Sequence, residues 1–260
     1  MKKIIALALA LVLMATCFAG CTSTASDSDL AYIQEKGKLV VGITEYAPMD
    51  YKDENGQWTG FDAELAELFA AELGVDCEFF VIADWSKKVF ELDSKNIDVI
   101  WNGMTIDDEL LNTTSCSDPY VVNAQVLVMK ADKLASYPDA ASIQNLSIAV
   151  ENGSTGEKAA KAAGCTNLVA VQDMAAALLE VAAGTSEACV VDITAAKAMT
   201  GEGTSYPDLA IGFSLVSEEY GVGFRKGSDV TAKLNAFLAE LKENGQLQAL
   251  ATKYELTLAE

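Results

Sequence analysis

Several polar residues stand where apolar runs of this 260-residue sequence end, and their types suit the binding of a small charged molecule. Asp192 follows the apolar run 188–191, so its carboxylate could form a charge-assisted bond with an ammonium group; a plain solvated aspartate is the alternative. The segment 101–105 ends another such run. Gly103 would let a ligand approach the backbone, and the amide and hydroxyl of Thr105 can donate to an oxygen.

Two further features belong to this predicted binding region. Within 101–105, Asn102 is an additional polar candidate, whereas Trp101 is expected to pack. The segment 153–156, Gly-Ser-Thr-Gly, precedes a predicted helix, whose free N–H groups and dipole favour an anion. Ser154 or Thr155 could instead act as a plain helix cap, a role that is compatible with binding.

Composition narrows the possible functions. The formal charge is −20 at pH 7, which leaves no electrostatic basis for nucleic-acid binding. The sequence contains no His, so the commonest general base and metal ligand is missing, and no Cys pair has metal-site spacing. We therefore expect no metal, no cofactor and no typical hydrolase chemistry.

The N-terminus predicts an exported protein. Lys2 and Lys3 precede an apolar run over residues 4–15, followed by small residues before Cys21, which is the pattern of a signal peptide over residues 1–20. The run is too short to span a membrane. Export would permit disulfides, but sequence cannot assign pairing, and we favour buried free thiols. The four cysteines concerned are Cys77, Cys116, Cys165 and Cys189.

Residues 18–21, Phe-Ala-Gly-Cys, resemble the lipobox of bacterial lipoproteins, with Phe18 in place of the usual Leu. This resemblance implies that the mature chain begins at a lipid-modified Cys21; an ordinary secretory signal is the alternative. Residues 21–29 are mostly small and polar with nothing to bury, which suits a flexible tether between the lipid and the folded domain.

Short β-rich runs alternate with segments of helical periodicity, which predicts an α/β fold with a parallel-rich sheet covered on both faces. In the first unit the predicted strands are 38–44, 77–82 and 98–101, the helices 61–73 and 86–93, and a hairpin turn 53–56. In the second unit the strands are 147–150, 168–171 and 188–191, and the helices 155–163 and 173–183. A helical tail over 229–254 breaks at Gly245. No composition break separates the units, which favours two lobes joined by short crossovers.

Eight short motifs, each weak alone, follow one another in order and spacing: 37–42 (GKLVVG), 60–62 (GFD), 96–100 (NIDVI), 103–106 (GMTI), 117–120 (SDPY), 153–157 (GSTGE), 191–192 (VD) and 219–227 (EYGVGFRKG). Together they resemble the amino-acid-binding family (family 3) of extracellular solute receptors of ABC transporters. The resemblance implies a two-lobed periplasmic-binding-protein-like fold of type II, in which a double hinge closes two α/β lobes on the ligand. It also implies that residues 30–123 and 217–260 form lobe 1 and residues 124–216 form lobe 2.

The resemblance implies particular ligand contacts. Tyr46 follows the first strand and Trp85 precedes a helix at the same edge, so each could stack on a ligand, or could simply pack. Met49 stands where the family usually has Phe, which implies a softer wall. In the family, the segment that matches 101–105 holds both the ammonium and the carboxylate of an amino acid. Asp192 matches the residue that pairs with the ligand ammonium.

One family residue is missing. Five residues after the position of Thr105, the family usually has an Arg that bonds the ligand α-carboxylate, and this chain has Leu110. We expect no replacement nearby, because the single Arg of the chain, Arg225, matches a structural strand. Either amides at Thr105 and Thr155 hold the carboxylate alone, or the ligand is an amine, an amide or a modified amino acid.

The sequence therefore predicts the lipid-anchored substrate-binding subunit of an ABC importer at the extracytoplasmic face of a bacterial membrane. We expect a monomer that captures a polar amino acid or related small amine and contacts permease subunits in the membrane. The alternative is an enzyme of the same fold, similar to cyclohexadienyl dehydratases, with Asp192 transferring protons. The absence of His, the absence of a second placed acid and the expected lipid anchor speak against an enzyme. A sensory or degenerate receptor is a third possibility.

Overall fold

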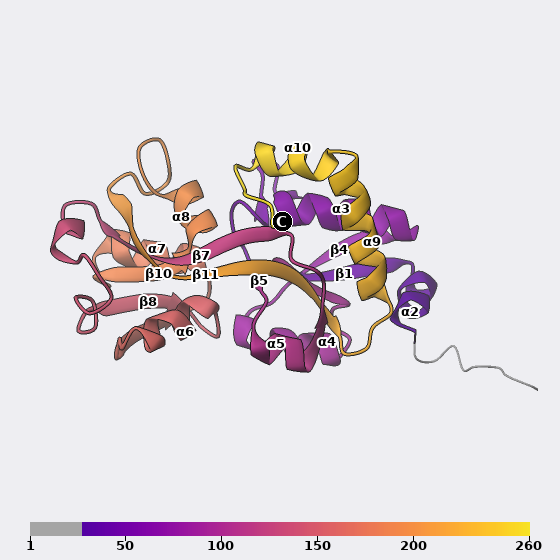
Figure 1. Ribbon diagram of the computed structural model, residues 1–260, viewed down its shortest axis with the longest axis horizontal. Coiled ribbons are helices and arrows are strands. Elements are labelled where there is room, and N and C mark those ends of the chain that lie inside the picture. Colours follow the sequence, from indigo (N-terminus) through magenta and orange to yellow (C-terminus); the bar gives the residue numbers. More distant parts are fainter. Residues whose placement is uncertain (1–27) are drawn as a thin grey trace, which may run out of the picture.

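The computed structural model describes residues 28–260, so the predicted signal peptide, Cys21 and most of the predicted tether lie outside the described residues. The described chain forms two α/β lobes that lie side by side and are joined by two long strands (Figure 1). The predicted two-lobed α/β fold is thereby confirmed. Among the described helices, none is long and apolar enough to cross a membrane.

Lobe 1 is built on the strand order β4-β1-β5-β11, with β1 parallel to both of its neighbours and β11 antiparallel to β5. Its strands are β1 (Lys38–Ile43), β2 (Tyr51–Lys52), β3 (Trp58–Thr59), β4 (Asp76–Val81), β5 (Val99–Thr105), β6 (Thr114–Cys116) and part of β11 (Leu209–Arg225). Its helices are α2 (Asp29–Lys36), α3 (Phe61–Leu73), the 3-10 turn η1 (Trp85–Lys87), α4 (Lys88–Asp93), α5 (Asp108–Thr113), α9 (Val230–Glu243) and α10 (Gln246–Lys253).

Helix α3 shows why these residues form these elements. Phe61, Leu65 and Phe69 recur four residues apart, so they share one helix face and are fully buried against the sheet. The helix ends at Gly74, whose φ of +74° is the left-handed conformation that favours glycine. Figure 1 shows α3 and α10 on one side of the lobe 1 sheet and α4 and α5 on the other.

Lobe 2 continues the sheet in the order β7-β10-β8-β9. Its strands are β7 (Val121–Lys130), β8 (Ser147–Glu151), β9 (Asn167–Val171) and β10 (Ala188–Asp192), and its helices are η2 (Leu134–Ser136), α6 (Thr155–Ala162), α7 (Met174–Ala183) and α8 (Ile193–Met199). Helices α7 and α8 cover one face and α6 covers the other (Figure 1). The parallel strands β10, β8 and β9 all end at the edge that faces lobe 1.

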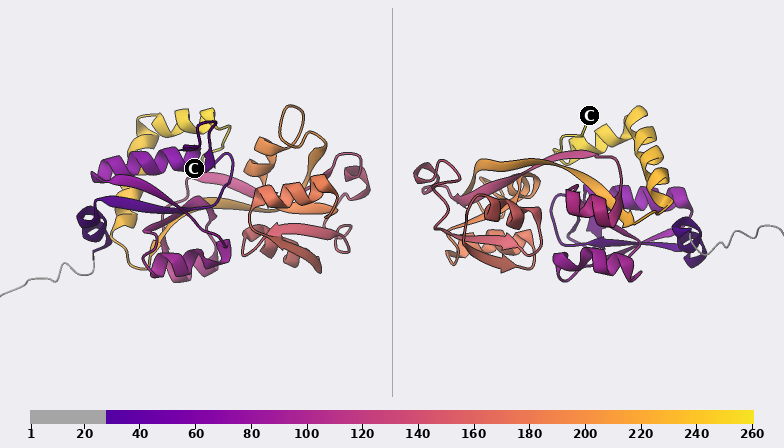
Figure 2. Two further views of the ribbon diagram at one scale, coloured as in Figure 1. Left: turned by 180° about the vertical axis from the view of Figure 1, so that it is seen from behind. Right: turned by 60° about the horizontal axis from the view of Figure 1, so that its bottom comes forward.

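The two segments that connect the lobes are the strands β7 and β11, not loops. β11 pairs with β5 through Tyr220 to Phe224 in lobe 1 and with β7 through Leu209 to Tyr220 on the way to lobe 2. Its register shifts near Gly221 and again near Ser214, and such irregularities bend a strand. Figure 2 shows β7 and β11 spanning the gap between the lobes from both further directions. The lobes therefore share one continuous sheet.

The N-terminal end of the described chain is fixed to lobe 1. Ser28 and Asp29, which the sequence assigns to the tether, cap and begin α2, and the Ser28 hydroxyl donates to Asp229 at 2.6 Å. All four cysteines in the described part are free, as predicted, but only Cys165 and Cys189 are buried, whereas Cys77 and Cys116 are partly exposed. Burial raises the pKa of the Cys77 thiol to about 12.

Candidate ligand-binding site

A cavity of about 240 Å³ lies between the lobes, at the carboxyl ends of β5, β8 and β10. This is where open α/β sheets bind ligands, and the volume is smaller than that of drug-sized sites, so it suits a molecule of amino-acid size. Seven of the nine predicted ligand-binding residues line it, namely Trp85, Asn102, Gly103, Thr105, Ser154, Thr155 and Asp192. The structure therefore brings together most of the residues that the sequence singled out.

Asp192 ends β10 and is 6% exposed. Its carboxylate accepts hydrogen bonds from the hydroxyls of Tyr46, at 3.0 Å, and Tyr220, and from the side-chain amide of Gln125. Burial raises the pKa of Asp192, and these donors partly oppose that shift. A ligand ammonium would stabilise the charged form further, so the site suits a cation.

Tyr46 does not line the cavity but lies behind its wall. The tyrosine is buried, and a Cβ atom at Gly103 would come within 2.6 Å of its ring. Gly103 also has a φ of +56°, so glycine is required there by both backbone conformation and space. Tyr46 acts on the site by donating to Asp192, which differs from the predicted stacking contact.

Met49 is placed away from the cavity, which corrects its assignment to the ligand wall. Its side chain is fully buried in the lobe 1 core, and its backbone carbonyl accepts the N–H of Asp62 at 3.0 Å, at the start of α3. Met49 therefore holds the start of α3 in place and contributes to packing, not to ligand contact.

Asn102 lines the cavity, but its side chain is committed elsewhere. The amide oxygen accepts the Thr44 N–H at 2.9 Å, and the amide nitrogen donates to the Thr44 hydroxyl at 2.8 Å, which ties β5 to the end of β1. Trp101 is fully buried and packs edge-on against Phe69, as expected. Trp85 is the aromatic side chain that forms part of the cavity wall.

Ser154 and Thr155 line the cavity at the start of α6. The Ser154 hydroxyl accepts the N–H of Glu157 at 3.1 Å, and the Glu157 carboxylate accepts the N–H of Gly153 at 2.8 Å. This pattern is a variant of the capping box, in which Glu157 reaches the N–H of the residue before the cap. Ser154 therefore caps the helix at the same place where it faces the cavity.

Sequence reasoning missed a second acid in the cavity. Glu151 ends β8 next to Asp192, is 3% exposed, and its Oε1 has no hydrogen-bond partner in the described part of the chain. Burial raises its pKa well above the usual range, and the charge of Asp192 raises it further. The expectation of no second placed acid is therefore wrong, although the strand-end pattern that identified Asp192 also applies to Glu151.

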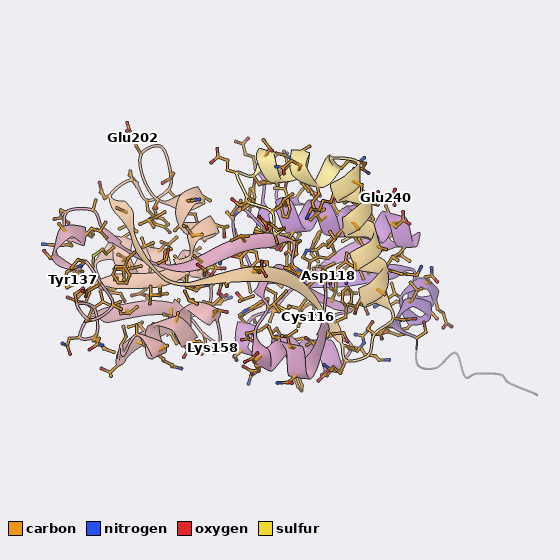
Figure 3. All side chains as sticks on the ribbon, viewed as in Figure 1. Cys116, Asp118, Tyr137, Lys158, Glu202 and Glu240 are labelled. Atoms are coloured by element: carbon orange, nitrogen blue, oxygen red, sulfur yellow. The ribbon has the colours of Figure 1, made fainter. Side chains whose placement is uncertain are left out.

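Sequence reasoning also missed two cations. Lys88 and Lys158 line the same cavity as Leu110, so two cations lie close to the position where the family has its Arg. Lys158 extends from α6 toward α5 (Figure 3) and its ammonium lies 2.7 Å from carboxylate oxygens of both Asp107 and Glu109. Both lysines belong to segments that the sequence marked only as helical, and their positions depend on how the lobes meet.

Other contacts across the cavity show that the lobes are closed on each other. The side-chain amide of Asn152 donates to Asp84 at 3.0 Å, and Lys88 donates to the Gly153 carbonyl at 3.3 Å. Gly153 lies so close to Ser86 that a Cβ atom there would be 2.6 Å from the Ser86 Cβ. A small molecule in the cavity would be enclosed by both lobes.

Two α/β lobes, a pair of crossover strands and a charged cavity at the strand ends define a two-lobed capture protein, which encloses a small solute between its lobes. Residues 39–257 match the model of the bacterial extracellular solute-binding proteins, family 3. The chain belongs to this family.

The similar proteins agree with this placement. The L-cystine-binding protein TcyJ of Escherichia coli strain K12 is 28% identical over 89% of this chain and 88% of its own length. The arginine-binding extracellular protein ArtP of Bacillus subtilis strain 168 is 28% identical over 94% of this chain and 96% of its own.

Two solved structures extend the comparison. A mutant of ArgBP from T. maritima has a TM-score of 0.81 and 32% identity, and covers 87% of this chain and 98% of its own. The ancestral amino acid-binding protein AncCDT-1, described as a precursor of cyclohexadienyl dehydratase, has a TM-score of 0.80 and 30% identity over 87% of this chain and 99% of its own.

Proposed function

We propose that this chain is the substrate-binding subunit of an ABC importer and captures a polar amino acid or a related small amine between its closing lobes. The observation that carries the proposal is the buried Asp192 carboxylate in an interlobe cavity of about 240 Å³. We propose that Trp85, Thr105, Thr155 and Asp192 contact this ligand directly, with Gly103 allowing close approach. Tyr46 positions Asp192.

The charges of the cavity favour a ligand that carries an ammonium. Asp192 and Glu151 are both buried on the lobe 2 side, and burial raises the pKa of each, so an added cation would relieve the cost of ionising them. Relatives that bind L-cystine and arginine support an amino acid as that cation. We propose lobe boundaries at 123/124 and 216/217, positions that lie opposite each other on the paired strands β7 and β11.

The N-terminal sequence supports a location outside the cytoplasm. We propose that Cys21 carries lipid, that residues 21–27 tether the folded domain to the extracytoplasmic face of the membrane, and that the closed lobes dock as a monomer on permease subunits. The relative described as extracellular, ArtP, supports this location.

We propose that the chain is not an enzyme, and one observation defines the competing candidate. Two buried acids, Glu151 and Asp192, face one cavity, as proton transfer in a dehydratase would require, and AncCDT-1 is described as a precursor of such an enzyme. That neighbour is itself described as an amino acid-binding protein, which supports the binding function.

The test is a ligand screen on the purified chain without its signal peptide. The common L-amino acids, L-ornithine, L-cystine and simple diamines are added singly, and the melting temperature is measured, because a ligand that binds only the folded protein raises it. We expect an amino acid or amine to raise the melting temperature. An unmoved curve across the panel would reject the transport function, and steady turnover of an aromatic amino-acid precursor would select the enzyme.

A further inference from the structure

Lys88 begins α4 and is a cation of the cavity that no other part of the described chain neutralises directly. We infer that Lys88 binds the carboxylate of the ligand and so supplies the cation that is missing at Leu110. The inference rests on the proposed function, because it concerns the same cavity and specifies an α-amino acid with a free carboxylate as its occupant.

The contacts of Lys88 leave its ammonium available. It donates to the carbonyls of Trp85, at 3.4 Å, and Gly153, at 3.3 Å, and lies 4.9 Å from the centre of the Trp85 ring. Both hydrogen bonds are long for an ammonium, which prefers about 2.7–2.9 Å with a carboxylate. Within residues 28–260, no carboxylate lies at ion-pair distance from it.

Lys158 provides the contrast. Its ammonium is paired with two carboxylates of α5 at 2.7 Å each, so its charge is already compensated by the protein. Lys88 is partly buried, and burial together with the charge of Lys158 lowers its pKa. An anion beside Lys88 would offset both effects, whereas a neutral ligand group would not.

The groups around Lys88 are hydrogen-bond donors that suit the carboxylate of a ligand. The Gly153 carbonyl that it reaches lies two residues before Thr155, the first residue of α6, so the ammonium stands beside the N–H groups of a helix N-terminus. Thr105 lines the same cavity and offers a hydroxyl and an amide. These donors match the two oxygens of one carboxylate.

Leu110 cannot take part in such binding. Its side chain is 5% exposed and packs in the apolar cluster of lobe 1 that includes Trp85 and Met104. Lys88 and Glu151 line one cavity and do not pair with each other, and the raised pKa of Glu151 means that its carboxyl ionises readily only beside an added cation. A zwitterion satisfies both signs at once, with its carboxylate on Lys88 and its ammonium toward the acids of lobe 2.

The experiment compares an amino acid with its own α-carboxamide. The L-α-amino acid that binds the wild-type chain most tightly in the screen is titrated by calorimetry, together with its amide, into wild type, Lys88→Met, Lys88→Gln and Lys87→Met. Lys87 is the matched control, because it is the adjacent lysine and is exposed away from the cavity. A double variant, Lys88→Met with Leu110→Arg, returns a cation to the position that the family uses.

We expect both Lys88 variants to weaken binding of the acid by about tenfold or more and that of the amide by less than about threefold, with Lys87→Met unchanged. The double variant should recover preference for the acid. Equal losses for acid and amide, or a wild type that does not distinguish them, would overturn the inference while leaving the transport function standing. A wild type that does not distinguish the acid from the amide overturns the inference even if a variant fails to fold. If only an amine without a carboxylate binds, this inference fails and the proposed function stands, whereas both fail if nothing in the screen binds.

Discussion

Replacing Gly153 by alanine should block closure of the lobes without unfolding either of them. Gly153 belongs to the loop before α6, and an added Cβ would stand 2.6 Å from the Cβ and 2.7 Å from the Cα of Ser86 in the other lobe. Favourable carbon–carbon contacts begin near 3.5 Å, so the two segments would have to separate by about 1 Å. Ser86 is held by Asp84 through two hydrogen bonds and cannot simply rotate away.

The expected loss of ligand affinity in Gly153→Ala follows from the contacts between the lobes that such a separation breaks. An extra 1 Å would remove the Asn152–Asp84 hydrogen bond, now 3.0 Å, and the contact of Lys88 with the Gly153 carbonyl. Each bond contributes roughly 0.5–1.5 kcal/mol, so the dissociation constant should rise about tenfold or more. The φ of +72° at Gly153 adds about 1 kcal/mol of strain to the folded variant, whether the lobes are open or closed.

Gly184→Ala is the matched control for this strain. Gly184 has a φ of +78°, lies in the same lobe at the end of α7, and has no atom within 4 Å of an added Cβ. Urea unfolding should show similar loss of stability in both variants, whereas calorimetry with the best ligand should show weaker binding only for Gly153→Ala. Equal affinities in the two variants would refute the claim that binding requires this approach of the lobes.

Other perturbations test the site, the hinge and the anchor. Asp192→Asn should weaken ligand binding by on the order of 2 kcal/mol in calorimetry, because a desolvated ammonium loses its counter-ion; an unchanged affinity would remove Asp192 from the site. Glu218 lies on the crossover strand β11 and accepts hydrogen bonds from Asn123 and Gln125 of β7, and burial raises its pKa from 4.5 to about 7. The folded chain therefore retains a proton that the unfolded chain loses, and stability without ligand should fall between pH 4.5 and 7 by on the order of 2 kcal/mol. Urea titrations should show a smaller fall in stability for Glu218→Gln than for wild type. Identical pH profiles would show that Glu218 does not cause this pH dependence. Cys21→Ala should release the protein from membranes in a fractionation, because the lipid on Cys21 is the proposed anchor; retention would contradict it.

The residues at strand ends could be predicted because their positions follow from local patterns. Asp192 ends a run whose residues are all apolar, and such a run between turn signals is typical of a buried strand. Gly103 and Thr105 stand at the end of β5 for the same reason. The order of helices and strands is local as well, so the bounds of α3 agree with its periodicity to the residue.

Residues whose roles depend on the other lobe could not be predicted in this way. Lys88 and Lys158 occupy ordinary polar positions of two helices, and only the meeting of the two lobes places both at one cavity. Tyr46 follows a strand end, as a ligand contact would, but the lack of a side chain at Gly103 lets its ring pass beneath the backbone and reach Asp192. The spacing of residues along the chain does not show whether a side chain lines the cavity or lies behind its wall.

Leu110 and Lys88 are coupled by charge, and the coupling can be measured. An arginine at 110 would enter a cavity wall that already holds the Lys88 ammonium, and two like charges there would repel each other as well as attract the carboxylate. Leu110→Arg should therefore improve binding of the acid less in wild type than in Lys88→Met, a difference that a double-mutant cycle isolates. The amide should show no such difference, because its neutral carboxamide offers no negative charge for either cation to bind. Additive effects on the acid would mean that the two positions act on separate parts of the ligand, and the role assigned to Lys88 would then have to be given up.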